Sequence, residues 1–381
     1  MIKIINISEW IDRAEALALL GVKPQTLYAY ASRGRIEVRR EMGGARRSLY
    51  RAEDVALLAR RADASRKPSA IAAGSIAWGE ASIVTQISTV QHGRLIYRGE
   101  DAVRFSERAT LEEAARLLWN SEGETDFRVR AAYRANPFEA LAALASRSEP
   151  SLGRGKARLC RDARSAIAHI AAACGIEPGS TPLHQRLASF WSVGAEDAER
   201  LRRALVLLAD HELNASTFAA RIAASTGAPI AACLLAGLCA LSGPRHGGAT
   251  AALTRMLGDA GREGPQATIR GWLDGNGALP GFGHPLYPNG DIRAIALCDM
   301  LKPDPLMGEL ADRVFESTGH LPNIDFALVA LARAARLPAD APFTLFLFGR
   351  SIGWAAHAME QILEGRLIRP RARYEGALPL T

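Results

Sequence analysis

Along most of the chain the apolar residues recur at intervals of three and four, which predicts a mainly α-helical protein. The clearest helical segments are ATLEEAARLLWN, KARLCRDARSAIAHIAAAC, EDAERLRRALVLLADH and PIAACLLAGLCALSG. Strand-like pieces are few, and IVTQISTV and RLIYRG are the best of them. Phenylalanine is scarce beside alanine. Small side chains of this kind favour close packing of helices over a sheet core.

The first sixty residues follow another pattern. The amphipathic stretch RAEALALL ends at Gly21, and Pro24 then stands where the first turn of a second helix would begin. IEVRREM, the turn GGARR and SLYR predict a two-stranded wing, and AEDVALL begins a last helix. This order resembles the winged helix-turn-helix of MerR-like and excisionase-like regulators.

The net charge of +7 is concentrated in this N-terminal module. Residues 1–67 contain 14 Lys and Arg against 8 Asp and Glu, whereas the remainder contains 33 against 32. Such an excess is typical of contact with nucleic acid, although a solvated basic face or a protein-docking surface would carry the same charge. The resemblance implies contacts with the major groove and with phosphates. The candidate residues are Gln25, Thr26, Tyr28, Arg33, Arg35, Arg46 and Arg47.

Composition excludes several other classes. The longest apolar stretch, near 230–241, is interrupted by Gly237 and is too short to span a membrane. The N-terminus lacks the pattern of a secretory signal, so we expect a cytoplasmic protein. Five cysteines without a CxxC spacing predict reduced thiols rather than disulfides or zinc, and the scattered histidines predict no metal site.

Four segments interrupt the helical pattern with residues that can carry chemistry. They are ADHELNASTFAAR with His211, LSGPRHGGATAALTR with His246, PGFGHPLYPNGDIRA with His284 and Arg293, and HLPNIDFALVALARA with Asp325. Two later segments add Arg350 and Arg369. A histidine at a helix N-terminus favours the neutral imidazole, and a carboxylate beside an apolar helix can act as a general base. Singly, each residue also fits a cap, a core position or a solvated surface. Together they suit a dianionic carboxylate substrate and proton abstraction next to a carbonyl.

The same segments, together with LIYRGEDAVRFSERATLEEAARLLWN, GRSIGWAAHAMEQ and IRPRARYEG, resemble the citrate synthase family in their order along residues 75–377. The resemblance implies a two-domain helical fold, with a large domain and a small lid domain, that works as a homodimer. We therefore predict four regions. They are a winged helix-turn-helix domain over 1–62, a linker over 63–75, a large domain over 76–245 and 333–381, and a small domain over 246–332.

The resemblance also implies roles for the candidate residues. His246 would polarise the acetyl-CoA carbonyl while Asp325 removes a methyl proton, and His284 would activate the carbonyl of oxaloacetate. Charge developing on the thioester oxygen must be met by a positioned donor, because the α-proton is only weakly acidic. His211, Arg293 and Arg350 would hold the oxaloacetate carboxylates. Arg369 would complete the site of the second subunit.

These roles imply an acyltransferase that condenses acetyl-CoA with oxaloacetate and hydrolyses the product to citrate and CoA. Acetyl-CoA would be a substrate, and no separate cofactor is implied. The sequence departs from the common family pattern at several positions that bear on CoA binding, among them Pro285, where many bacterial members have Arg. Three alternatives therefore stay open. They are a 2-methylcitrate synthase that uses propionyl-CoA, a DNA-binding regulator whose synthase-like body senses a carboxylate or an acyl-CoA, and a related acyl-CoA condensing enzyme that acts on another 2-oxo acid.

Overall fold

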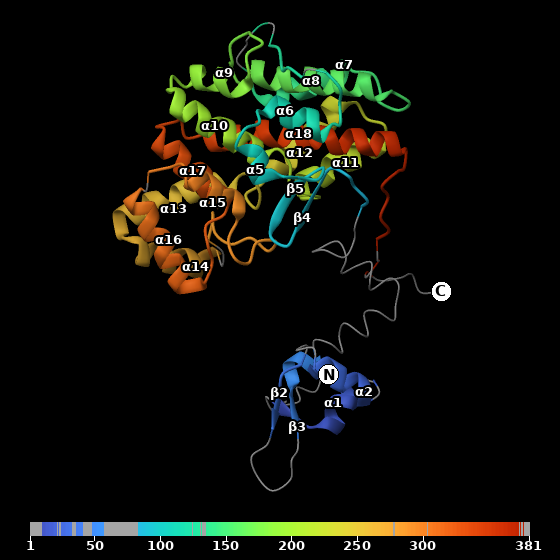
Figure 1. The fold of residues 1–381 in the computed structure, drawn as a ribbon, viewed down its shortest axis with the longest axis vertical. Helices are drawn as coiled ribbons and strands as arrows, with labels where there is room; N and C mark the ends of the chain where they lie inside the picture. Colours follow the sequence, from blue (N-terminus) through green and yellow to red (C-terminus); the bar gives the residue numbers. More distant parts are fainter. Residues whose placement is uncertain are drawn as a thin grey trace. The chain divides into compact units, whose positions relative to one another are not determined.

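The computed structural model divides the chain into two compact units, which are described separately here. One comprises residues 1–83 and 370–381, and the other comprises residues 84–369. Helices predominate in the larger unit, as the apolar periodicity predicts (Figure 1). The residues that the structure describes are 10–20, 22, 24–32, 36–40, 48–56, 83–123, 125–129, 131, 135–276, 279–302, 304–372, 374 and 376.

In the smaller unit, two short helices and a three-stranded antiparallel sheet enclose a core of their own. The elements are β1 (Trp10–Ile11), α1 (Arg13–Leu20), α2 (Pro24–Ser32), β2 (Val38–Arg40) and β3 (Ser48–Arg51), with strand order β1-β3-β2. Leu27, Ile36 and Val55 are buried within this core. Helix α2 begins at Pro24, as predicted, and residues 52–56 are helical. The predicted turn GGARR, the linker over 63–75 and Gly21 lie outside the described residues.

The larger unit begins with a small antiparallel sheet of β4 (Ser88–Gln91), β5 (Arg94–Tyr97) and β6 (Glu100–Asp101), in the order β4-β5-β6. Its described helices are α5 (Ala102–Ser106), α6 (Leu111–Leu118), α7 (Pro137–Arg147), α8 (Lys156–Ala173), α9 (Leu183–Phe190), α10 (Ala195–Leu208), α11 (Ala215–Ser225), α12 (Ile230–Leu241), α13 (Ala249–Glu263), α14 (Pro265–Asn276), α15 (Ile292–Cys298), α16 (Pro305–Thr318), α17 (Ile324–Ala334) and α18 (Ala341–Glu364).

Helix α18 is the centre of the larger unit. Its 24 residues are buried over most of their length, and α6, α8, α10, α11, α12 and α17 all pack against it. Glycines allow the closest of these approaches. A Cβ at Gly349 would lie 2.5 Å from the Cβ of Leu208, so α18 and the end of α10 meet backbone against backbone.

The larger unit contains two hydrophobic cores. The second and smaller core is built from apolar residues of α13, α14, α16 and α17 and of the segment 279–282. Helix α17 contributes to both, because Ala327 and Leu328 face the main core while Phe326 and Val329 face the second. The residues of the second core fall between Leu253 and Val329, inside the range 246–332 that we predict as the small domain.

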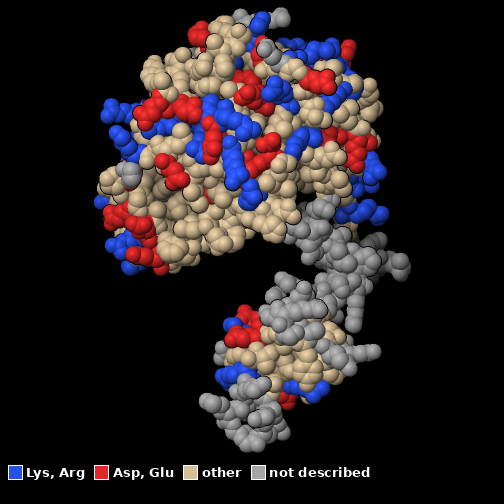
Figure 2. Space-filling view, in the orientation of Figure 1, with Lys and Arg blue, Asp and Glu red and all other residues tan. Residues whose placement is uncertain are grey.

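Charged side chains of both signs are interspersed over the visible face of the larger unit (Figure 2). This agrees with its near balance of basic and acidic residues, and it gives that face no single-sign field. Within the described residues, none of the helices is both long and apolar enough to cross a membrane. Helix α12 spans residues 230–241 as a core helix, with Cys233, Leu234 and Leu238 fully buried.

Candidate active site

His211 lies in the turn between α10 and α11, and its ring is 5% exposed. Its Nε2 is 3.0 Å from the hydroxyl of Tyr287, and its ring centroid is 5.0 Å from that of His284. The turn is held from beneath by Tyr97 of β5, whose hydroxyl donates to the carbonyl of Asp210 at 3.0 Å. Burial, and then the charges of Arg293 and Arg350, keep the pKa of His211 well below its usual range.

His284 is held in a glycine loop between α14 and α15. Gly281 has a φ of +84°, and a Cβ there would lie 2.7 Å from Leu253, so glycine is required. The backbone N–H of Leu286 donates to Nδ1 of His284 at 3.2 Å, which leaves the proton of a neutral ring on Nε2. Burial, followed by the charge of Arg293, lowers the pKa of His284 to about 4. The ring is therefore neutral and can donate from Nε2.

Three hydrogen bonds, two between backbone groups and one from a side chain, join this loop to the segment that precedes α17. The N–H of Gly283 donates to Leu321 O at 2.8 Å, and that of Asn323 donates to Gly281 O at 2.9 Å. The side-chain amide of Asn323 donates to Gly283 O at 3.1 Å and its oxygen caps α17. His284 and Asp325 are therefore fixed to one local framework, although they are far apart in the sequence.

Asp291 is a buried residue of this site that the sequence reasoning missed. Its carboxylate forms two hydrogen bonds with the guanidinium of Arg293, at 2.9 and 2.7 Å, and caps α15 through the N–H of the same residue. It also accepts from the N–H of Ile324 at 3.1 Å, directly before Asp325. Burial alone would lower the pKa of Arg293, but the charge and hydrogen bonds of Asp291, together with Tyr287 and Tyr97, raise it. The motif PNGDIR contains this acid, and its position two residues before Arg293 is the signal that could have identified it.

Asp325 lies in the first turn of α17, which Asn323 caps in its place. Its side chain is partly exposed as a whole, but Oδ1 is enclosed and has no hydrogen-bond partner among the described residues. Burial raises the pKa of Asp325 to about 7, against the lowering effect of Arg293 and with support from Asp291. Near neutral pH this carboxyl can therefore both accept and release a proton.

His246 lies in the turn between α12 and α13. Its Nε2 is 2.8 Å from the hydroxyl of Ser216, and its ring meets Phe346 edge-on at 5.7 Å. Ser216 accepts from Trp354 at 3.0 Å, and its single proton can go either to His246 or to Asn214. Burial and the charges of Arg350 and Arg293 lower the pKa of His246 to about 3. The ring is therefore neutral, as a result of burial and of the two arginines, whereas the sequence argument predicts a neutral ring from the helix N-terminus.

Arg350 is 1% exposed and projects from α18 toward the turn that carries His211. Its Nε donates to Leu208 O at 3.1 Å, and its guanidinium lies 5.1 Å from the ring centroid of Phe346. Among the described residues, no hydrogen-bond partner is assigned to its two terminal nitrogens. Burial lowers the pKa of Arg350 to about 10, so it stays charged at neutral pH.

The structure thus brings His211, His284, Arg293 and Asp325 together, with Arg350 of α18 and His246, in the turn after α12, beside them. The charges of Arg293 and Arg350 act to lower the pKa of each of the three histidines and of Asp325. Arg369 does not join them within one chain, because it is exposed in the irregular segment after α18.

The nucleic-acid candidates lie in the other unit. Tyr28 is 49% exposed on α2, and the guanidinium of Arg13 lies 5.2 Å from its ring centroid. Thr26 is partly exposed on the same helix. The side chain of Gln25 falls outside the described residues. So do Arg33, Arg35, Arg46 and Arg47.

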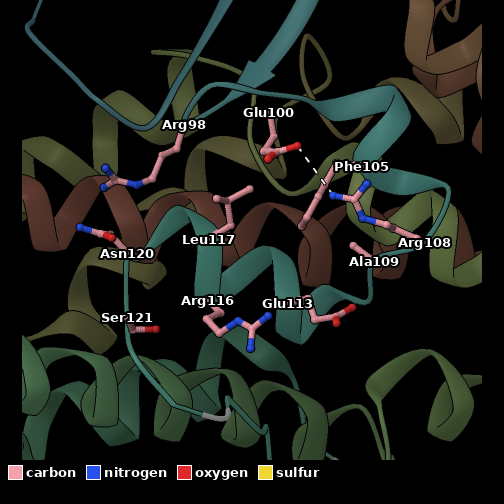
Figure 3. Close-up of a pocket in the computed structure, with 10 residues that line it drawn as sticks. All are labelled: Arg98, Glu100, Phe105, Arg108, Ala109, Glu113, Arg116, Leu117, Asn120 and Ser121. Carbon is pink, nitrogen blue, oxygen red and sulfur yellow. Dashed lines mark ion pairs between the residues drawn. The ribbon is translucent and has the colours of Figure 1, made fainter.

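A cavity of about 810 Å³ lies away from the histidines, on the face formed by the β5–β6 turn, α5 and α6 (Figure 3). Arg98 and Arg108 flank its apolar floor at Leu117, with Arg116 below them in the view. Arg108 is 3.8 Å from Glu100. None of the candidate site residues lines this cavity, so its size does not mark the site of the chemistry. The described residues contain no group of three or more side chains suited to hold a metal ion.

Comparison with known proteins agrees with this geometry. The family pattern described as "Citrate synthase, C-terminal domain" matches residues 138–371. Citrate synthase 2 of Bacillus subtilis is 38% identical over 191 residues, which are 47% of this chain and 51% of that protein. The 2-methylcitrate synthase 2 of Corynebacterium glutamicum is 33% identical over 191 residues, 47% and 50% of the two chains. The chain thus matches about half of the length of each of these relatives.

The fold is also shared with solved structures. Citrate synthase from Thermotoga maritima superposes with a TM-score of 0.67 at 24% identity, covering 80% of this chain and 96% of that one. The enzyme of Thermoplasma acidophilum, solved with carboxymethyl coenzyme A and oxaloacetate, gives 0.60 at 23% identity, covering 78% and 95%. The larger unit thus has the citrate synthase fold. Because the family pattern covers more than half of its residues, this chain belongs to the citrate synthase family.

Proposed function

We propose that the protein condenses acetyl-CoA with oxaloacetate and hydrolyses the resulting thioester to citrate and CoA. One observation carries the proposal: Asp325, with an enclosed and unpartnered oxygen and a pKa of about 7, lies on the same framework as the neutral donor His284. A base and a hydrogen-bond donor held together in this way suit carbon–carbon bond formation between two carbonyl compounds.

In this proposal Asp325 removes a proton from the methyl group of the thioester while His246 donates a hydrogen bond to the thioester carbonyl. His246 can donate from Nδ1 only when the Ser216 hydroxyl donates to Nε2, which the 2.8 Å contact allows. A positioned donor of this kind is worth roughly 3–4 kcal/mol in the transition state. The proposed function therefore requires that the Ser216 hydroxyl donate to His246 rather than to Asn214.

The enol carbon then attacks the carbonyl of oxaloacetate, which His284 polarises from Nε2, and the resulting alkoxide takes up a proton. Arg293, Arg350 and His211 hold the two carboxylates. Water finally cleaves the citryl thioester, so that acetyl-CoA, oxaloacetate and water give citrate and free CoA. Acetyl-CoA is a substrate here, and these steps require no further cofactor.

The test is release of free CoA thiol by the purified protein with oxaloacetate, using acetyl-CoA and propionyl-CoA side by side and Asp325→Ala as the blank. We expect release above the blank with acetyl-CoA as the faster substrate. Faster release with propionyl-CoA would instead assign a 2-methylcitrate synthase, a possibility that the similarity to the Corynebacterium proteins favours. No release with either, despite oxaloacetate binding, would contradict the enzyme and favour a sensor.

We further propose a homodimer in which Arg369 of each subunit completes the site of the other. Its exposure in the segment after α18, outside the cluster of its own chain, supports this arrangement. Arg369→Ala should weaken oxaloacetate binding. Mixing it with Asp325→Ala should restore part of the activity, because a mixed dimer then contains one site with neither change. No restoration in mixed dimers would contradict a shared site.

We also propose that the N-terminal module is a winged helix-turn-helix that binds duplex DNA. Support comes from its basic charge, from the exposed side of α2 at Tyr28 and from the antiparallel pairing of β2 with β3. Binding by the full chain should fall steeply as salt rises, and replacing both Arg46 and Arg47 by alanine should reduce the logarithmic salt slope by about two. Weak binding that is unchanged by salt would contradict the proposal.

A further inference from the structure

A chain of buried polar side chains adjoins the candidate active site, and we name it the Asp210 relay: Arg221, His357, Asp210 and Ser88. Nη1 of Arg221 donates to Nδ1 of His357 at 3.1 Å, and Nε2 of His357 donates to Asp210 at 3.2 Å. The hydroxyl of Ser88, from β4, donates to the same oxygen of Asp210. Arg221, His357 and Asp210 are all fully buried.

The protonation state of the relay follows from its chemistry. Arginine donates only, so Nδ1 of His357 must be the acceptor, and the hydrogen of the neutral ring stands on Nε2, directed at Asp210. Oδ2 of Asp210 is thus met by two donors, His357 and Ser88, while Oδ1 is buried without a partner among the described residues. Burial raises the pKa of Asp210, and the hydrogen bonds from His357 and Ser88 and the charge of Arg350 act in the opposite direction. Asp210 is therefore an ionised carboxylate with a fixed orientation.

The inner end of the relay lies near Arg350, whose charge acts on Asp210, although the two groups form no ion pair among the described residues. Arg350, Gly353 and His357 are spaced i, i+3 and i+7, so they share one face of α18. A Cβ at Gly353 would lie 2.1 Å from Oδ1 of Asp210 and 2.6 Å from the carbonyl of Ala209. The turn that carries Asp210 therefore packs directly on the backbone of α18, one helical turn from Arg350.

The outer end of the relay is closed by acids and amides of the same helix. Arg221, on α11, also donates to Glu360 at 2.8 Å and to Gln361 at 3.0 Å. A buried ionic set of this size adds little net stability compared with apolar residues of the same volume. We therefore explain the set by the charge that it holds in place. This charge is the carboxylate of Asp210, which directly precedes His211 and lies near Arg350.

We propose that Asp210 is a positioning residue. The relay fixes its charge, and that charge holds the guanidinium of Arg350 and the backbone at His211 in the geometry that receives a carboxylate of oxaloacetate. The proposal rests on the proposed function, since it assigns Arg350 and His211 to oxaloacetate. Asp210 itself touches no substrate.

The first test replaces Asp210 by asparagine, which removes the charge at nearly constant volume. In titration calorimetry of the full chain, the Kd for oxaloacetate should rise roughly tenfold or more, while the KM for acetyl-CoA stays within about twofold. A merely structural role would weaken both. Ser351→Ala is the matched control, because this buried hydroxyl on α18 bonds only to Leu347 O at 2.6 Å, and it should leave both constants unchanged.

A second pair of variants decides the matter even where Asp210→Asn does not fold. His357→Leu removes the donor to Asp210, whereas the amide of His357→Gln can accept from Arg221 and donate to Asp210. Oxaloacetate binding should be weakened in the leucine variant and largely rescued in the glutamine variant.

Equal binding of oxaloacetate by the leucine and glutamine variants would overturn the positioning role, as would unchanged binding by Asp210→Asn. Failure of the wild-type chain to bind oxaloacetate or to release CoA would overturn the proposed function, and this proposal with it. The wild-type measurement thus tells the two failures apart.

Discussion

The regions around Asp325 and Asp210 contain the same buried carboxyl group in opposite states. Burial acts in the same direction on both, yet the pKa of Asp325 is raised to about 7, whereas that of Asp210 is lowered. The difference lies in their partners. Both carboxyl groups have an enclosed Oδ1 without a partner among the described residues, but Oδ2 of Asp210 accepts from His357 and Ser88, whereas no donor among those residues meets either oxygen of Asp325. Burial raises the pKa of a carboxyl group, and hydrogen-bond donors around it lower that pKa again. The donors therefore decide whether the group is a fixed carboxylate or a base that takes up a proton near neutral pH.

The largest expected effect concerns Asp325 as the base. Asp325→Asn keeps the volume but cannot accept a proton, so turnover should fall roughly 10²- to 10⁴-fold while oxaloacetate binding changes little. Steady-state kinetics and titration calorimetry together measure this separation. Asp210→Asn should show the reverse pattern, with binding lost before turnover at saturating oxaloacetate. Normal turnover in Asp325→Asn would show that the base is wrongly assigned.

The pH dependence sharpens the same contrast. Because Asp325 must be ionised to act and its pKa is about 7, kcat/KM should fall about tenfold per pH unit below neutrality. Asp210 is ionised throughout this range and contributes no such limb. A pH–rate profile between pH 5 and 9 measures the effect, with a buffer control at constant ionic strength. A flat profile down to pH 5 would contradict the raised pKa.

Gly353→Ala tests the anchor without removing a charged group. The added methyl would meet Oδ1 of Asp210 at 2.1 Å, so the turn must move, and we expect a loss of about 1–3 kcal/mol in unfolding free energy together with weaker oxaloacetate binding. Gly308→Ala on α16 is the matched control. Its Cβ would meet nothing within 4 Å, and it should gain about 0.5–1 kcal/mol. Chemical denaturation of both variants measures the difference.

A further effect is on stability as a function of pH. The pKa of Asp325 rises from 3.8 to about 7 on folding, so the stability that its protonated form contributes below pH 4 is lost as pH rises toward 7. The Asp325→Asn variant has no titrating carboxyl group at this position, so this pH dependence is absent from it. Its advantage in unfolding free energy over the wild type should grow between pH 4 and 7 and then level off. Denaturation at pH 5, 6, 7 and 8 measures this, and a constant difference would contradict it.

The sequence predicts the residues that stand in recognisable local patterns. His246 and His284 lie in glycine turns, and Asp325 opens an apolar helix, so each could be found from its immediate neighbours. The helical character of the larger unit follows in the same way from the spacing of apolar residues. These features depend on interactions between residues that are close in the sequence, so the order of the residues is enough to predict them.

The Asp210 relay could not be predicted from the sequence because its contacts are long-range. His357 stands 147 positions from Asp210 and 136 from Arg221, and nothing local indicates that a histidine in the middle of an apolar helix meets them. Ser216 lies in the first turn of α11, but its contact with His246 depends on how α11 and the turn before α13 meet. Tertiary packing, rather than local propensity, creates such partners.

The contacts between the loop at Gly283 and the segment at Asn323 have a mechanical consequence. Because three hydrogen bonds tie these stretches together, any displacement of α17 carries the His284 loop with it. The spacing between Asp325, the proposed base, and His284, the proposed donor to the second carbonyl, is then a constant of the molecule, because both belong to one mechanical unit.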